Sequence, residues 1–236
     1  MIPKIIHYCW FGTKKMSKLE IDCIESWKIK LPEYQFIMWN ENNFDISVNK
    51  YVQQAFENKK FAFVSDYCRL KALHDFGGIY LDTDVLVLKS YDDLLADNSL
   101  VFGMEDSNVI STACILSKPN NEFIRQLLID YDKLLFVTNN ELNLTPNTKR
   151  ITEKIKKDFQ LALNNRSFFK NKEITILPQE LFSPKIFGTN KSLSIKDSYC
   201  IHLFNASWVP ASVKIKERIA RNIPKFLYSF YSNFFK

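Results

Sequence analysis

The sequence predicts an α/β fold with an open, mainly parallel sheet covered by helices. Segments with strand patterns alternate with segments of helical periodicity along most of its 236 residues. The hydrophobic fraction of 46% is sufficient for a large core and argues against disorder. Five glycines and eight scattered prolines leave no stretch that resembles a linker. We therefore expect ligands to bind at the carboxyl ends of the strands.

The first part of the chain contains two strand and helix pairs and then a third helix. The predicted strands cover residues 3–10 and 34–39, where apolar and aromatic residues are enriched. The predicted helices cover residues 17–30, 47–58 and 63–76, where apolar residues recur at helical spacing. Gly77 and Gly78 should end the third helix, because glycine is a poor helix former.

Residues 79–88 have the pattern of one strand buried on both faces, interrupted by Asp82 and Asp84. Side chains two residues apart on a strand point to the same face, so the two carboxylates should converge. Ionised carboxylates are costly inside a protein unless a cation or hydrogen-bond donors compensate them. The pair therefore predicts a site for Mn²⁺ or Mg²⁺, ions that leave positions open for the phosphate oxygens of a nucleotide.

A less specific interpretation of Asp-Thr-Asp is a solvated strand end after a Gly-Gly turn. Two aspartates separated by one residue are common by chance, and the pair alone favours this interpretation. Its surroundings favour the metal site, because the pair interrupts an apolar run. It also directly follows a helix that carries Asp66 and Arg69 on neighbouring turns.

The second part of the chain continues the alternation of helices and strands. A short helix is predicted at 91–97, strands at 100–104 and 109–116, and an amphipathic helix at 120–136. We expect the amphipathic helix to cover the sheet, because its apolar residues lie on one face.

Composition indicates the cellular compartment of the protein and the class of its partners. The five cysteines are widely spaced in apolar segments, as is typical of buried thiols in a reducing environment. The N-terminal apolar run is too short for a signal peptide, and no stretch reaches the length of a transmembrane helix. We therefore expect a cytoplasmic protein. A net charge of +6 without a nucleic-acid-binding motif favours an anionic substrate or membrane surface over nucleic acid.

The block SDYCRLKALHDFGGIYLDTDV, residues 65–85, resembles the donor-site signature of family 32 glycosyltransferases. This family includes yeast initiating mannosyltransferases and bacterial polysaccharide enzymes, and the block is similar also to the glucosyltransferase domain of clostridial toxins. The resemblance implies an α/β fold of the GT-A type, with a single Rossmann-like mixed sheet flanked by helices. The residues that match the signature are Ser65, Asp66, Arg69, Tyr80, Asp82 and Asp84.

The resemblance also implies roles for these residues. The Asp and Arg of the S-D-x-x-R segment contact the nucleotide sugar in the family, and the D-x-D pair holds the metal and the diphosphate. We therefore expect Asp82, Asp84 and Arg69 to be catalytic. Ser65, Asp66 and Tyr80, together with Arg69, are expected to bind the donor.

Motifs on either side extend the resemblance to residues 1–208. An I-H-x-x-W motif ends at Trp10, whose ring is expected to stack on the donor base. An I-L-P-x-x-x-F-x-P motif occupies residues 176–184, whereas Thr145 replaces the Gly that usually opens the family's preceding helix. The H-x-x-x-x-S-W motif makes His202 the expected third metal ligand, although a lone histidine on an apolar strand is more often part of the core. The same motif predicts three donor-binding residues, Asn205, Ser207 and Trp208.

We expect residues 1–208 to form the glycosyltransferase domain and residues 209–236 to form a basic, aromatic tail. Basic and large apolar residues recur in this tail at near-helical spacing. Two interpretations remain open for it. The tail is either a helix packed on the domain or an interfacial helix on an anionic membrane.

The function that the resemblance implies is metal-dependent, retaining transfer of a hexose or related sugar. The expected donor is a UDP-linked nucleotide sugar, and the expected acceptor is a saccharide carried on a lipid, as in capsule or O-antigen assembly at the inner face of the membrane. One alternative is a haloacid-dehalogenase-like phosphohydrolase, but its D-x-D motif normally opens the domain. The other is a non-catalytic membrane-surface binding protein, which has no need of two aspartates within a strand.

Overall fold

A computed structural model describes residues 1–186, 188–189 and 191–205 of the chain. The chain divides into two compact units, residues 1–203 and 204–236, and only residues 204 and 205 of the second unit are described. The predicted tail at 209–236 therefore lies outside the described residues, and the predicted boundary at 208 stays a prediction. Within the described residues, no helix is long and apolar enough to cross a membrane.

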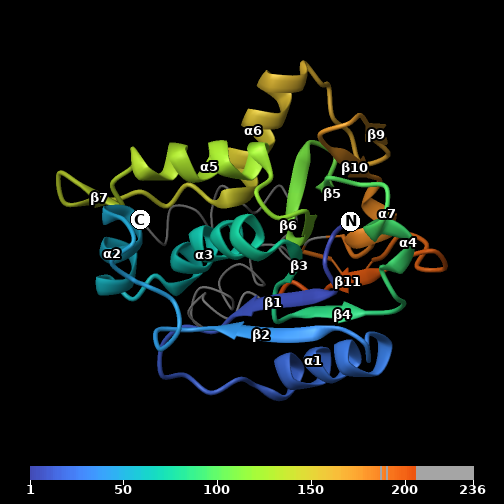
Figure 1. The fold of residues 1–236 in the computed structure, drawn as a ribbon, viewed down its shortest axis with the longest axis horizontal. Coiled ribbons are helices and arrows are strands. Elements are labelled where there is room, and N and C mark those ends of the chain that lie inside the picture. Colours follow the sequence, from blue (N-terminus) through green and yellow to red (C-terminus); the bar gives the residue numbers. More distant parts are fainter. Residues whose placement is uncertain (187, 190, 206–236) are drawn as a thin grey trace, which may run out of the picture. The chain divides into compact units, whose positions relative to one another are not determined.

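The first unit is built on a seven-stranded sheet (Figure 1). Its strands are β1 (Ile5–Cys9), β2 (Gln35–Trp39), β3 (Gly78–Leu81), β5 (Leu100–Asp106), β6 (Val109–Ser117), β9 (Phe169–Lys170) and β10 (Thr175–Leu177). Their order in the sheet is β2-β1-β3-β6-β5-β10-β9. Two smaller sheets pair β4 (Val85–Val87) with β11 (Cys200–His202), and β7 (Val137–Thr138) with β8 (Glu141–Leu142).

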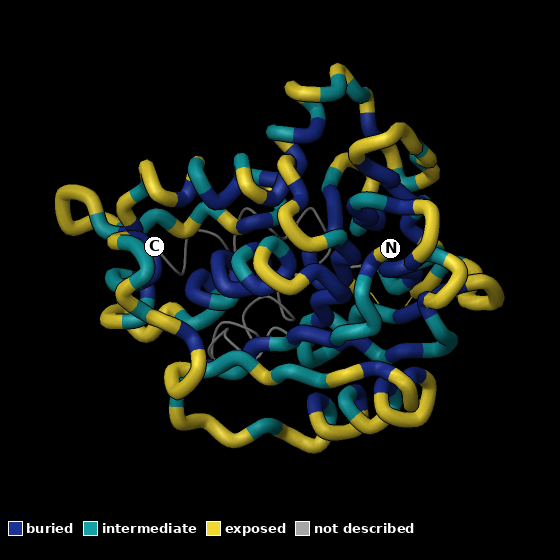
Figure 2. The backbone as a smooth tube through the Cα atoms, in the orientation of Figure 1, coloured by how far each residue is buried: buried dark blue, intermediate teal, exposed yellow. Residues whose placement is uncertain are grey.

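Helices cover both faces of the sheet and create two hydrophobic cores. The helices are α1 (Lys18–Lys30), α2 (Lys50–Glu57), α3 (Phe61–Phe76), α4 (Asp92–Leu95), α5 (Glu122–Asp132), α6 (Asn147–Phe159) and α7 (Gln179–Phe182). One core contains buried side chains of α2, α3, α5 and α6, and the other contains those of α1, α4 and α7. Adjacent strand residues alternate between the cores, as Ile79 and Tyr80 do. Figure 2 shows that the strands in the middle of the sheet are mostly buried, whereas outer turns of the helices are exposed.

The predicted α/β class is confirmed, and so is the mixed sheet that the resemblance implies, whereas the expectation of a mainly parallel sheet from the alternation of elements is wrong. The pairs β1·β2, β1·β3 and β5·β10 are parallel, whereas β3·β6, β5·β6 and β9·β10 are antiparallel. The reason for the difference is the short connection at Ser107 and Asn108 between β5 and β6. Two residues can close a hairpin but cannot form the long crossover that parallel strands need.

The prediction of one continuous strand over residues 79–88 is wrong. The chain leaves the main sheet after Leu81, turns at Thr83 and Asp84, and enters the separate two-stranded sheet as β4. A continuous buried strand would enclose the carboxylates of Asp82 and Asp84, and the turn instead keeps both partly exposed. The five cysteines are buried free thiols, as predicted.

Candidate metal and donor site

The candidate site lies at the carboxyl ends of the parallel strands. β3 is parallel to β1, and β6 runs antiparallel to both β3 and β5, so β1, β3 and β5 run in one direction. Their carboxyl ends therefore meet at one edge of the sheet, where Trp10, Asp82 and Glu105 lie. This is the edge at which sheets of this kind bind their ligands.

Backbone hydrogen bonds fix the turn that carries the two aspartates. The Asp82 N–H donates to the Ala113 carbonyl at 2.8 Å, and the Val85 N–H closes the turn on the Asp82 carbonyl at 3.0 Å. The Leu203 N–H donates to the Asp84 carbonyl at 3.0 Å, next to the pairing of His202 with Val85. The turn is thus anchored to β6 on one side and to β11 on the other.

These anchors bring Asp82, Asp84 and His202 together. Each of the three side chains offers one ligand atom, and these atoms all lie within 4.8 Å of one another. The side chains of Asp82, Asp84 and His202 are 27%, 14% and 14% exposed, so each remains partly open to solvent. The sequence therefore predicted the convergence correctly, but a turn produces it and not the alternation of a strand.

The chemistry of this group fits a divalent cation. Two carboxylates supply the hard oxygen ligands that Mg²⁺ and Mn²⁺ prefer, and an imidazole nitrogen suits a transition metal such as Mn²⁺ better than Ca²⁺. Asp82, Asp84 and His202 would hold the ion.

Two buried side chains, Arg69 and Tyr80, contact the carboxylate of Asp82. The Tyr80 hydroxyl donates to Asp82 Oδ1 at 2.8 Å, and Arg69 Nη1 lies 3.3 Å from the same oxygen. The Arg69 guanidinium also lies 4.4 Å from the centre of the Tyr80 ring. Both side chains are buried, so they set the orientation of Asp82 in a place from which water is largely excluded.

Asp66 completes a second layer of this network. Arg69 Nη2 lies 2.9 Å from Asp66 Oδ1, and the Asn147 N–H at the start of α6 donates to Asp66 Oδ2 at 3.2 Å. Burial raises the pKa of Asp66 to about 6, and Arg69 opposes that shift. Arg69 also donates to the Thr112 carbonyl at 2.7 Å. These contacts of Asp66 and Arg69 are with protein groups, so their expected contacts with the donor stay predictions.

His202 lies between two carboxylates, of which the sequence analysis identified only one. Its Nε2 is 3.4 Å from Asp84 Oδ1, and its Nδ1 is 3.8 Å from Glu105 Oε2. Burial disfavours the imidazolium, but Asp84 and Glu105 outweigh burial and raise the pKa of His202 to about 10. The signal that could have found Glu105 is its place at the carboxyl end of the strand predicted at 100–104.

The remaining residues predicted to bind the donor do not belong to the group of Asp82, Asp84 and His202. Trp10 is half-buried just beyond β1, and its indole N–H donates to the Lys14 carbonyl at 2.6 Å. The Ser65 hydroxyl donates to the Phe61 carbonyl within α3 at 3.0 Å. Asn205 is described and half-buried, whereas Ser207 and Trp208 lie outside the described residues. The donor-binding roles of these five residues therefore stay predictions.

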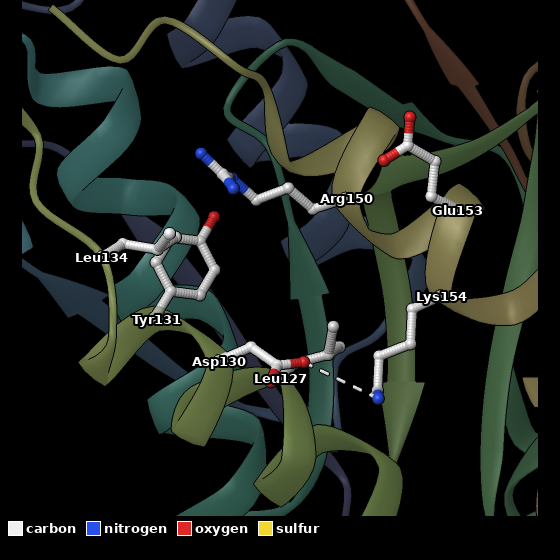
Figure 3. Close-up of a pocket in the computed structure, with 7 residues that line it drawn as sticks. All are labelled: Leu127, Asp130, Tyr131, Leu134, Arg150, Glu153 and Lys154. Carbon is white, nitrogen blue, oxygen red and sulfur yellow. Dashed lines mark ion pairs between the residues drawn. The ribbon is translucent and has the colours of Figure 1, made fainter. Parts of the chain in front are cut away.

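A separate pocket of about 220 Å³ lies against α5 and α6 (Figure 3). Its lining residues are Leu127, Asp130, Tyr131, Leu134, Arg150, Glu153 and Lys154. Lys154 Nζ lies 3.6 Å from Asp130 Oδ2. The lining carries two acidic and two basic side chains, so it has no net charge to select a nucleotide or a cation. None of the predicted site residues belongs to it.

Comparison with known proteins identifies the region that carries the aspartates. Residues 17–101 match the sequence model of the family described as "Glycosyltransferase sugar-binding region containing DXD motif". Over 84 residues, 31% of this chain, the sequence is 39% identical to Glucan organizing enzyme 1 of Cryptococcus neoformans. Over 157 residues, 53% of this chain, it is 26% identical to Subversion of eukaryotic traffic protein A of Legionella pneumophila. These alignments span 23% and 24% of the relatives' own lengths.

A solved structure shares the fold. The PaToxG glycosyltransferase superposes with a TM-score of 0.51 at 19% identity, covering 67% of this chain and 70% of that one. The family match favours a glycosyltransferase over the phosphohydrolase and the non-catalytic binding protein considered above. Residues 17–101 thus resemble the DXD-containing sugar-binding region of glycosyltransferases, and the described residues share the GT-A fold.

Proposed function

We propose that this protein is a metal-dependent, retaining glycosyltransferase that moves a hexose or related sugar from a UDP-linked donor to a saccharide acceptor. The observation that carries the proposal is the convergence of Asp82, Asp84 and His202 within 4.8 Å at the carboxyl edge of the sheet. The match of residues 17–101 to a glycosyltransferase sugar-binding region supports sugar transfer as the reaction class.

The arrangement of the site suits departure of a nucleoside diphosphate. A bound Mn²⁺ or Mg²⁺ would neutralise negative charge on the diphosphate, which grows as the bond to the sugar breaks. Tyr80 and Arg69 orient the carboxylate of Asp82, because both contact its Oδ1 atom. The network that extends to Asp66 supports this geometry from the interior of the domain.

The donor would lie along the carboxyl edge of the sheet. Trp10 follows β1 at this edge and presents the aromatic surface that a uracil ring needs. Retention of configuration is consistent with attack by the acceptor hydroxyl on the face from which the diphosphate leaves. In that step the new bond from the anomeric carbon to the acceptor oxygen replaces the bond to the phosphate oxygen, and the acceptor proton passes to the departing phosphate.

Hydrolysis of nucleotide sugars by the full chain tests the proposal. The purified protein is incubated with Mn²⁺, Mg²⁺ or EDTA and a panel of UDP- and GDP-sugars, and release of the nucleoside diphosphate is followed. We expect slow, Mn²⁺-dependent hydrolysis of a UDP-sugar, with the anomer first released identified by NMR. The variant D84N removes one of the three expected ligands, and D106N, which changes an exposed acid, is its matched control. Donor hydrolysis that survives EDTA would contradict metal dependence, and the absence of hydrolysis with every donor would contradict the assigned function.

We also propose that the acceptor is carried on a lipid at the inner face of the membrane. The basis is the composition of residues 213–236, which combine basic residues with Phe and Tyr. An anionic surface would attract such a segment, and its aromatic residues favour the interface between water and lipid.

A further inference from the structure

We propose that Glu105 is a positioning residue, which holds the imidazole of His202 so that Nε2 faces Asp84 and the cation. This inference rests on the proposed function, because it concerns the same metal group. The sequence motifs do not include Glu105, and its side chain is absent from the group of three that could ligate an ion.

The path of β5 brings Glu105 to the site. In the pairing of β5 with β6, Met104 lies opposite Ile110 and Asp106 lies opposite Val109, so Glu105 is an extra residue between two paired positions. An extra residue of this kind is a β-bulge, and bulges redirect side chains at the ends of strands. The Glu105 side chain is 20% exposed and is thus turned toward the interior, whereas Asp106 is exposed.

Two contacts then set the direction of the Glu105 carboxylate. The Ser111 hydroxyl of β6 donates to Glu105 Oε2 at 3.4 Å, and the same oxygen lies 3.8 Å from His202 Nδ1. Ser111 is itself buried, so it provides a fixed support for the acid. The carboxylate is therefore held on the Nδ1 side of the ring.

The two nitrogens of the His202 ring face different carboxylates. Nε2 lies 3.4 Å from Asp84, one of the other two ligands, whereas Nδ1 faces Glu105. A neutral imidazole carries one N–H, and the other nitrogen keeps the lone pair that binds a metal. With a cation bound between Asp84 and His202, the Glu105 carboxylate would favour the ring proton on Nδ1, and Nε2 would keep the lone pair for the ion. Carboxylates commonly orient metal-binding histidines in this way.

The variants E105A and E105Q, with D106A as the matched control, test this role. Mn²⁺ affinity is measured by calorimetry without donor, and the coupling of bound Mn²⁺ to the histidine ¹⁴N is measured by pulsed EPR. We expect E105A to bind Mn²⁺ roughly 10–100-fold more weakly, with a reduced ¹⁴N coupling. E105Q keeps a side-chain acceptor and should retain the coupling and more of the affinity, while D106A should behave as the wild type.

Several results would overturn the inference. Wild-type Mn²⁺ affinity and ¹⁴N coupling in E105A would show that Glu105 does not position His202. A loss of affinity in E105Q as large as in E105A would instead indicate that the Glu105 carboxylate binds the ion directly. A further measurement needs no variant: ¹⁵N NMR of the Mg²⁺-loaded wild type should show His202 protonated at Nδ1, and a proton on Nε2 would refute the assignment. If the wild type binds neither ion, the metal site of the proposed function fails as well.

Discussion

Replacing Arg69 by Lys tests the buried network that supports the candidate site. The Arg69 guanidinium reaches Thr112 at 2.7 Å, Asp66 at 2.9 Å and Asp82 at 3.3 Å, and the residue is only 5% exposed. Lysine keeps the charge but has a single side-chain nitrogen. It therefore cannot contact all the groups that surround the planar guanidinium of arginine. The loss of two hydrogen bonds to a charged group, at about 1.5–3 kcal/mol each, should lower the free energy of unfolding of R69K by about 3–6 kcal/mol.

Urea denaturation of R69K beside R125K measures this effect. Arg125 donates from Nε and Nη2 to Glu122 at 2.7 Å, but the two side chains are 49% and 66% exposed. An exposed pair contributes little, so R125K should stay within about 0.5 kcal/mol of the wild type. R69K should also bind Mn²⁺ more weakly, because Asp82 loses a partner that orients it. A loss of stability in R69K no larger than in R125K would refute the account of Arg69 as the centre of a buried network.

Three further predictions concern the metal group, a buried histidine and the tail. D84N should abolish sugar transfer and strongly weaken Mn²⁺ binding while the protein stays folded, and near-normal turnover would refute the metal assignment. Burial lowers the pKa of His7 to about 4, although its hydrogen bond to the Gly77 carbonyl has a smaller, raising effect. As the pH falls, His7 therefore binds a proton more readily in the unfolded chain than in the folded protein. Stability from His7 should thus fall by about 1 kcal/mol from pH 7.5 to pH 5.5, and H7Q should lack this component in urea titrations at the two pH values. Replacing three tail residues by Ser should abolish flotation with anionic liposomes while donor hydrolysis persists; these residues are Phe230, Phe234 and Phe235. Continued flotation of this variant would contradict membrane binding through these aromatic side chains.

Local sequence patterns predicted most of the fold because local forces dominate those elements. The helix expected at 17–30 is observed at Lys18–Lys30, and its start is set by a capping box in which the Ser17 N–H donates to Glu20 at 2.7 Å. The helix expected at 120–136 is shorter, Glu122–Asp132, with the Asn121 side chain capping its first turn. The small strands β7, β8 and β9 were missed, because two residues carry no measurable period.

The candidate site was predicted only in part, because its geometry depends on long-range contacts. Asp82 and Asp84 are separated only by Thr83, and their place within an apolar run is visible in the sequence. Glu105 approaches His202 across 97 positions of the chain, through a bulge in β5 that no local pattern indicates. The contacts expected between the donor and the residues Asp66 and Arg69 stay predictions, and no local pattern indicated their contacts with Asp82, Asn147 and the backbone of Thr112.

Three consecutive residues of β6 explain how these distant parts are held in one arrangement. Ser111 donates to Glu105, the Thr112 carbonyl accepts from Arg69, and the Ala113 carbonyl accepts from the Asp82 N–H. β6 thereby supports the acid beside His202, the guanidinium behind Asp82 and the start of the aspartate turn. Because β6 lies inside the seven-stranded sheet between β3 and β5, these supports move only if the sheet moves. A site that must hold two carboxylates close together without a cation needs such rigid support, since their repulsion would otherwise spread them apart.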